Sequence, residues 1–229
     1  MNSHYTYFLI LAGSLIGPLI LSFDKKVAFY KNWKHLFIGM LAPALFYIIW
    51  DMAFTQKGVW SFNEDYITGI KIYNLPLEEV LFFFVVPYCC VFIYECVRCY
   101  FPKIQQTPLG LFVLKLIGFI LLLLAMLNHN KDYTFFTFFF NGLFIFILAS
   151  TKKYFHSFNV NVFLISYLVI LIPFLIVNGF LTSIPVVIYN NNENLNFRIY
   201  TIPFEDIFYG MLLIMMNIAG YMRSKMKSR

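Results

Sequence analysis

Long apolar runs alternate with short polar segments along the whole chain. A helix of about 20 apolar residues crosses the hydrocarbon core of a bilayer. Seven runs approach this length, near His4–Phe23, His35–Phe54, Pro76–Val97, Leu109–Asn128, Tyr133–Ser150, Val160–Leu181 and Pro203–Met222. The pattern predicts an all-α integral membrane fold with these seven runs as transmembrane helices.

The sequence motif that precedes the third run is repeated before the seventh run. Residues 74–80 read Asn-Leu-Pro-Leu-Glu-Glu-Val, and residues 201–207 read Thr-Ile-Pro-Phe-Glu-Asp-Ile. Upstream positions match without a gap: Val59, Asn63, Lys71, Ile72 and Tyr73 correspond to Val186, Asn190, Arg198, Ile199 and Tyr200. The copies lie four runs apart, so both enter the membrane in the same direction. We predict two parallel three-helix repeats, residues 1–105 and 131–229, with a linker span within residues 106–130.

The loop before each repeated motif has the alternation and residue types of β-strands. Val59–Phe62 and Ile70–Tyr73 flank a turn-forming segment, and Val186–Tyr189 and Phe197–Tyr200 flank an asparagine-rich turn. We therefore predict one short interfacial β-hairpin per repeat, over the entrance of the acidic helix. The aromatic residues of these loops are typical of an interfacial belt, with a lid as an additional role: Trp60, Tyr73, Tyr189 and Tyr200.

Composition and charge exclude a soluble domain and set an orientation. Hydrophobic residues make up 61% of the chain and charged residues 12%. The net charge of +6 is spread over short loops, which gives no case for a nucleic-acid partner. One side carries Lys25, Lys26, Lys31, Lys34, Arg98, Lys103, Lys152, Lys153, Arg223, Lys225, Lys227 and Arg229, and the other only Lys57, Lys71, Lys131 and Arg198.

This asymmetry predicts that the basic side is cytoplasmic. The protein is then a multi-pass protein of the cell (inner) membrane with its C-terminus inside and both acidic motifs toward the outer face. No cleavable signal peptide is evident in the sequence. The basic tail Arg223–Arg229 stops translocation, and its further use is contact with lipid headgroups.

The cysteines and histidines do not form a recognisable cofactor site. Cys89, Cys90, Cys96 and Cys99 all fall in one apolar run, without a second pair or a nearby histidine, so packing is their expected role. We expect no bound metal. No Gly-x-Gly-x-x-Gly segment follows a strand, so no dinucleotide fold and no cofactor are expected.

The repeated acids Glu78, Glu79, Glu205 and Asp206 stand where charge is expensive, at the start of membrane spans. Acids at a helix start also face unpaired amides and the positive end of the helix dipole, which would explain a single copy. The repetition and the matched approach segments favour a functional role. Asp51, and Asn178 at its repeat-equivalent position, end their spans, and a functional role and a wetted helix end both stay open for them.

Helix geometry limits how these acids can meet. Adjacent helical residues point about 100° apart, so both acids of one motif cannot face one spot. One acid from each repeat, paired across the pseudo-twofold axis, is the economical arrangement. Two acids near an apolar pocket cannot both ionise cheaply, which indicates a proton-sharing cluster in which acid and base are not assigned individually.

At these residues the chain resembles the small integral-membrane lycopene cyclases that use no flavin. Those occur as two subunits, as a fused chain, or fused to phytoene synthase, and the resemblance covers nearly the whole chain in the fused two-repeat form. One departure is Ile188-Tyr189, where an aromatic pair would be expected. The resemblance rests on Trp50-Asp51, Gly58–Asn63, Pro76–Glu79 with its phenylalanine run, Asn178-Gly179, Tyr189-Asn190, Arg198 and Thr201–Asp206.

The resemblance implies a lycopene cyclase of carotenoid biosynthesis, an isomerase that works by acid–base chemistry without a cofactor. Its partners would be lycopene and the bilayer; homo-oligomers and contacts with other carotenoid enzymes stay open, as do the number and type of rings and the substrate's length. Aromatic ring faces would stabilise the cation. The implied catalytic residues are Glu78, Glu79, Glu205 and Asp206, and the implied substrate-binding residues are Asp51, Trp60, Phe82, Phe83, Asn178 and Tyr209.

A proton-coupled membrane carrier of a small hydrophobic solute is the alternative, because repeats and intramembrane acids are also typical of carriers. Against it, the acids cluster at one membrane face and Pro43 and Pro173 do not match between repeats. A retinal-binding protein would need a lysine in the last span, and a prenyltransferase would need aspartate-rich magnesium motifs; neither is present.

Overall fold

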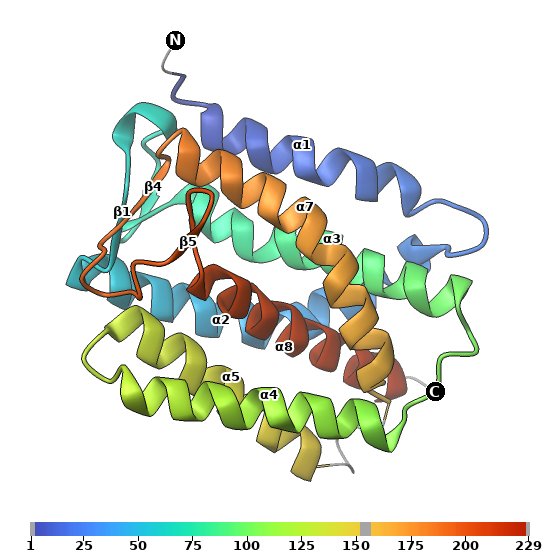
Figure 1. Ribbon diagram of the computed structural model, residues 1–229. Coiled ribbons are helices and arrows are strands. Elements are labelled where there is room, and N and C mark those ends of the chain that lie inside the picture. Colours follow the sequence, from blue (N-terminus) through green and yellow to red (C-terminus); the bar gives the residue numbers. More distant parts are fainter. Residues whose placement is uncertain (1–2, 152–156, 228–229) are drawn as a thin grey trace.

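In the part of the chain that the structure describes, seven long helices form the body of the protein, and each coincides with one of the predicted apolar runs (Figure 1). The structure is a computed structural model that describes residues 3–151 and 157–227. Lys152, Lys153 and Arg229, on which the orientation partly depends, lie outside the described residues. The helices are α1 (Thr6–Leu21), α2 (Trp33–Lys57), α3 (Leu77–Tyr100), α4 (Pro108–Leu127), α5 (Asp132–Ser150), α7 (Val160–Ser183) and α8 (Glu205–Lys227).

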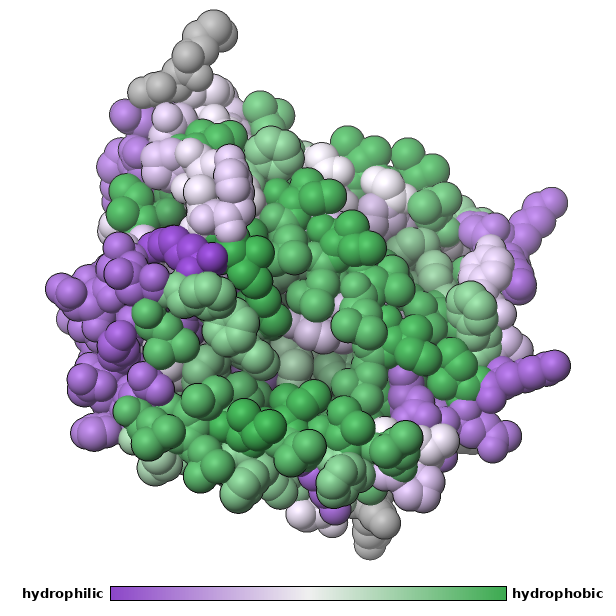
Figure 2. Space-filling model, in the orientation of Figure 1, coloured by the Kyte–Doolittle hydropathy of each residue, from purple (hydrophilic) through white to green (hydrophobic). Residues whose placement is uncertain are grey.

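The helices form a membrane-type surface with an apolar band between two polar ends. In the described part of the chain, α2, α3, α4, α5 and α7 are long and apolar enough to cross a membrane, and α1 is a shorter apolar helix. Figure 2 shows the visible apolar side chains between hydrophilic groups at the hairpin end and at the opposite end. The all-α membrane fold predicted from the sequence is confirmed.

The two repeats interlock instead of packing as separate bundles. Within each repeat the first helix packs on the third, α1 on α3 and α5 on α8. Between repeats the second helix of one packs on the third helix of the other, α2 on α8 and α7 on α3. Helix α4 lies outside this core and packs mainly on α5 (Figure 1). The acidic helices α3 and α8 therefore lie at the centre, each held by helices of both repeats.

Glycines bring α2 and α8 into backbone contact. A Cβ on Gly39 would overlap the backbone of Gly220 and Tyr221, and a Cβ on Gly220 would overlap the backbone of Gly39. Small residues at a crossing let membrane helices approach closely, and van der Waals packing then holds them together. This contact joins the second helix of one repeat to the third helix of the other.

Six short strands cap the end of the bundle where the acidic helices begin. They are β1 (Trp60–Phe62), β2 (Lys71–Ile72), β3 (Leu75–Pro76), β4 (Val187–Tyr189), β5 (Arg198–Ile199) and β6 (Ile202–Pro203). Strands β2 and β3 form a small hairpin in the first repeat, and β5 and β6 form its equivalent in the second. Each repeat thus has a short hairpin, but its two strands are not the two segments that were predicted to pair.

The strand pairing predicted for β1 is wrong. This strand does not pair with the Ile70–Tyr73 segment of its own repeat but runs antiparallel to β4 of the other repeat, with Ser61 opposite Ile188. One further backbone hydrogen bond flanks each end of this two-stranded ribbon. The Asn63 N–H donates to the Val186 carbonyl at 3.0 Å, and the Asn190 N–H donates to the Val59 carbonyl at 2.9 Å. Equivalent residues thus exchange equivalent bonds about a pseudo-twofold axis through this ribbon.

The hairpin turns repeat the same backbone conformation. Tyr73 has φ of 59° and its equivalent Tyr200 has φ of 60°. A positive φ is uncommon for a bulky residue, and it costs free energy that the surrounding structure must supply. The same costly turn, placed before both acidic helices, fixes the direction from which each helix starts.

Candidate active site

The first acid of each motif anchors the loop above it. The Thr68 N–H donates to Glu78 Oε1 at 2.7 Å, and in the second repeat the Leu195 N–H donates to Glu205 Oε1, also at 2.7 Å. The Thr134 hydroxyl donates to the same Glu205 oxygen at 2.6 Å. Both side chains are buried but do not line the central cavity. Glu78 and Glu205 therefore fold their loops onto the helix starts.

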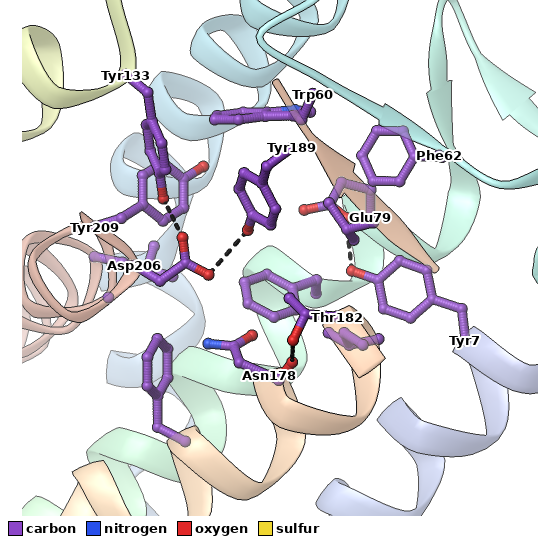
Figure 3. Close-up of a pocket in the computed structure, with 16 residues that line it drawn as sticks. Tyr7, Trp60, Phe62, Glu79, Tyr133, Asn178, Thr182, Tyr189, Asp206 and Tyr209 are labelled. Carbon is purple, nitrogen blue, oxygen red and sulfur yellow. Dashed lines mark hydrogen bonds between the residues drawn. The ribbon is translucent and has the colours of Figure 1, made fainter. Parts of the chain in front are cut away.

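The second acid of each motif points into one shared cavity between the repeats (Figure 3). The Tyr7 hydroxyl of α1 donates to Glu79 Oε2 at 2.6 Å. In the second repeat the Tyr133 hydroxyl of α5 donates to Asp206 Oδ1 at 2.5 Å. Each repeat thus supplies one carboxyl group and one tyrosine from its first helix. The hypothesis of one acid per repeat matches this geometry.

Asp206 has a second phenolic donor. The Tyr189 hydroxyl of β4 donates to Asp206 Oδ2 at 2.9 Å, and Figure 3 shows its ring between the two carboxyl groups. Burial raises the pKa of the Tyr189 phenol well above its ordinary value, and the Asp206 carboxylate raises it further. Tyr189 therefore stays protonated and donates. Arg198 lies over the Tyr189 ring, 5.9 Å from its centroid, on the side of the interface.

Glu79 has a different neighbour, a third carboxyl group. The side chain of Asp51, at the end of α2, interacts with the side chain of Glu79. The Trp60 indole N–H donates to Asp51 Oδ1 at 2.5 Å, and the Thr55 hydroxyl lies 3.4 Å from the same oxygen. Asp51 is buried. The repeat-equivalent residue is Asn178, so the two halves of the site are not chemically identical.

Aromatic rings form most of the remaining wall. Trp60 lies edge-on to Tyr133 at 5.2 Å and to Tyr209 at 6.0 Å between ring centroids. Tyr133 and Tyr189 stack at 5.8 Å. The cavity has a volume of about 40 Å³. Its lining also includes Phe62, Phe82, Phe174, Asn178, Leu181, Thr182, Val187, Gly210 and Leu213.

Four of the six predicted substrate-binding residues line this cavity: Trp60, Phe82, Asn178 and Tyr209. Asp51 lies behind Trp60 and acts on the cavity through Trp60 and Glu79. Phe83 does not reach it, because helix rotation turns its ring inward onto Tyr47, with the centroids 5.6 Å apart.

Two tyrosines that bind the acids were missed from the sequence. Tyr7 and Tyr133 lie 126 residues apart in the first helices of the two repeats, one residue out of the 127-residue register of the acidic motifs. That near match was the available signal, but single tyrosines near span ends are ordinary belt residues. Among the described residues, no group of three histidine, cysteine or acidic side chains is placed to hold a metal ion.

The comparisons with known proteins identify the family of this chain. The lycopene cyclase family model matches two segments of the chain, residues 4–97 and 130–223. The chain belongs to the lycopene cyclase family. Each matched segment contains one acidic motif, one acid-binding tyrosine on its first helix and one strand of the ribbon between the repeats.

One curated lycopene cyclase relative is similar over part of its length. The bifunctional lycopene cyclase/phytoene synthase of Aspergillus niger is 32% identical to this chain over 110 residues. The aligned region covers 48% of this chain and 17% of that protein. No solved structure matches the chain.

Proposed function

We propose that this protein is a lycopene cyclase that closes the linear end of lycopene into an ionone ring without net oxidation or reduction. The observation that carries the proposal is the meeting of Glu79 and Asp206, one from each repeat, in a single aromatic-walled cavity. Membership of the lycopene cyclase family supplies the substrate class.

Cyclisation needs an acid, a base and a surrounding that tolerates a cation. A proton is added to the terminal double bond, and the neighbouring double bond attacks the resulting carbocation to close the ring. Loss of a proton from the ring then restores a double bond, so one proton enters and one leaves. Carboxyl groups are suited to both transfers. The reaction is an isomerisation and consumes no electrons.

The neighbours of the two carboxyl groups favour different roles for them. When two carboxyl groups are in contact in an apolar environment, sharing one proton costs less free energy than ionising both groups. In this proposal the Asp51–Glu79 pair therefore holds the proton to be donated. Hydrogen bonds from Tyr133 and Tyr189 stabilise the anionic form of Asp206. Glu79 is therefore the proposed acid and Asp206 the proposed base.

The aromatic wall supplies the remaining requirement. Ring faces of Trp, Tyr and Phe attract a cation, and the attraction is strongest where water is excluded. Trp60, Tyr189 and Tyr209 lie between and around the two carboxyl groups. These rings would stabilise the carbocation while the geometry of the pocket decides which proton is removed. A β-type ring, as in γ-carotene or β-carotene, is the proposed product.

Expression in a cell that accumulates lycopene tests the proposal. We expect chromatography of the pigments to show a cyclised product and a matching loss of lycopene. Membranes that hold the protein at normal abundance but contain only lycopene would contradict the proposal and favour the carrier alternative.

We further propose that the basic end of the protein is cytoplasmic, in the cell (inner) membrane. The hairpins and acidic motifs lie at one end of the bundle and the C-terminus at the other (Figure 1). A reporter fused after Arg229 should be active in the cytoplasm. Activity only on the outer side would reverse the orientation and put the acid pocket at the inner face.

A further inference from the structure

A second, almost wholly apolar cavity lies next to the acid pocket, between α1, α3 and α7. It has a volume of about 170 Å³ and shares Phe82, Phe174 and Asn178 with the acid pocket. Each of the three helices contributes lining residues that are one helical turn apart: Ser14 and Pro18 on α1, Cys89 and Ile93 on α3, and Pro173 and Val177 on α7. The cavity therefore runs along the helix axes, away from the hairpins.

The length of this groove follows from α3. Glu79 lies in the acid pocket and Ile93 at the far end of the groove, 14 residues later in the same helix. At 1.5 Å per residue the two positions are roughly 21 Å apart along the axis. The combined space is thus narrow, long and open to the apolar part of the bundle, with the acids at one end.

Among the described residues of the other half, an apolar cavity of about 530 Å³ lies between α2, α5 and α8, but large rings separate it from the acid pocket, with which it shares no lining residue. Phe46 and Trp50 occupy the positions that correspond to Pro173 and Val177, and both pack against Phe140 of α5. Trp50 lies 5.1 Å from Phe140 and Phe46 lies 5.4 Å from Phe140, between ring centroids. Trp50 also packs on Tyr209 at 5.2 Å. A surface depression outside these rings shares no lining residue with the acid pocket.

We propose that the α1–α3–α7 groove binds the linear polyene chain of the substrate while one end group occupies the acid pocket. The proposal rests on the proposed function and extends it. An extended hydrocarbon chain gains binding free energy from apolar contact and makes no demand for polar partners, which is the chemistry that this groove offers. Because large rings separate the cavity of the other half from the acid pocket, the groove is the single entrance for the chain among the described residues, and the two ends of one molecule react in separate binding events.

Phe174 lies at the junction of the two spaces. A Cβ on Gly210 would come within 2.7 Å of the Phe174 ring, so the absence of a side chain at Gly210 provides the space that the ring occupies. The 40 Å³ pocket is sized for water molecules, and an end group needs more space. Movement of the Phe174 ring away from the junction would join the pocket and groove into one channel.

Blocking the far end of the groove separates chain binding from chemistry. Ile93→Trp fills the half-buried far wall, and Ile172→Trp is the matched control on the lipid-facing side of α7, where the native side chain is 66% exposed. We expect Ile93→Trp to lower the cyclisation rate of lycopene by about 10-fold or more. A short acyclic terpene with the same end group should react at the wild-type rate in both variants.

Lycopene turnover by Ile93→Trp at the wild-type rate would overturn the groove assignment. Equal loss with both substrates, in protein of normal abundance, would overturn it as well, because the damage would then lie in the acid pocket. Ring formation by the wild-type protein is the separate test of the proposed function.

Binding is also measured without chemistry, through a thiol in the groove. Cys89 is half-buried there, and a variant that keeps Cys89 alone, with Cys90, Cys96 and Cys99 changed to Ser, gives one labelling site. We expect lycopene to slow its reaction with an apolar maleimide. Protection without ring formation would reject the proposed function but retain the groove; ring formation without protection would reject the groove.

The single entrance has its own kinetic signature. With lycopene in large excess, the one-ring product should accumulate beyond the amount of enzyme before any two-ring product appears. Two-ring product formed within the first turnover would overturn the single entrance.

Discussion

Glu79→Gln and Asp206→Asn each lower ring formation by about 10²-fold or more, the usual scale for loss of a positioned acid or base. The amide keeps the size of the side chain and most of its hydrogen bonding but does not carry a proton for transfer. Both residues line the acid pocket, and each accepts a bond from the tyrosine of its own repeat. The rate of carotenoid cyclisation in isolated membranes is the measurement.

Glu78→Gln and Glu205→Gln are the matched controls, one residue away in each motif. A Gln side-chain oxygen still accepts the N–H of Thr68 or Leu195, so the loop anchor survives the change. We expect both controls to retain activity within a few-fold. Equal loss at all four positions would mean that the division into anchoring and pocket-facing acids is wrong.

Gly220→Val removes most of the folded protein from the membrane. The added side chain would overlap the backbone of Gly39, which cannot move as a flexible side chain does. Overpacking typically costs about 1–3 kcal/mol, and here the relief requires separation of α2 from α8. The abundance of detergent-extracted, monodisperse protein measures the effect.

Gly13→Val on α1 is the control, because a Cβ there meets nothing within 4 Å. It should leave abundance unchanged, since the lipid-facing surface accepts an apolar side chain. Normal abundance and thermal stability of Gly220→Val would contradict the close crossing of α2 and α8, and with it the interlocked arrangement of the repeats.

The helices were predictable because each coincides with an apolar run, and those of α2, α3, α4, α5 and α7 are long and apolar enough to cross a membrane. The parallel repeat was predictable from its gapless match. The pattern predicted the wrong partner for β1, the Ile70–Tyr73 segment of its own repeat. Strands of three residues carry too little information to choose between two nearly equivalent partners, and the choice depends on the helix packing that brings β4 alongside.

The candidate site was predictable in its acids but not in their division of labour. Helix geometry predicted that one acid of each motif would face the shared spot, yet which one depends on the angle at which α3 and α8 start. The turns at Tyr73 and Tyr200 and the loop bonds to Glu78 and Glu205 together hold each helix start, and those bonds join residues ten positions apart. The proximity of Asp51 to Glu79 depends on tertiary packing, which no local pattern encodes.

Ring formation in heavy water tests the central claim most directly. Purified protein is exchanged into heavy water without added flavin or other cofactor and mixed with a smaller molar amount of lycopene, so that each site turns over with its own exchanged proton. The account predicts one solvent deuterium in each ring formed, because the initiating proton comes from an exchangeable carboxyl group. Rings that contain no deuterium, or ring formation that depends on added reduced flavin, would contradict acid–base cyclisation by this site.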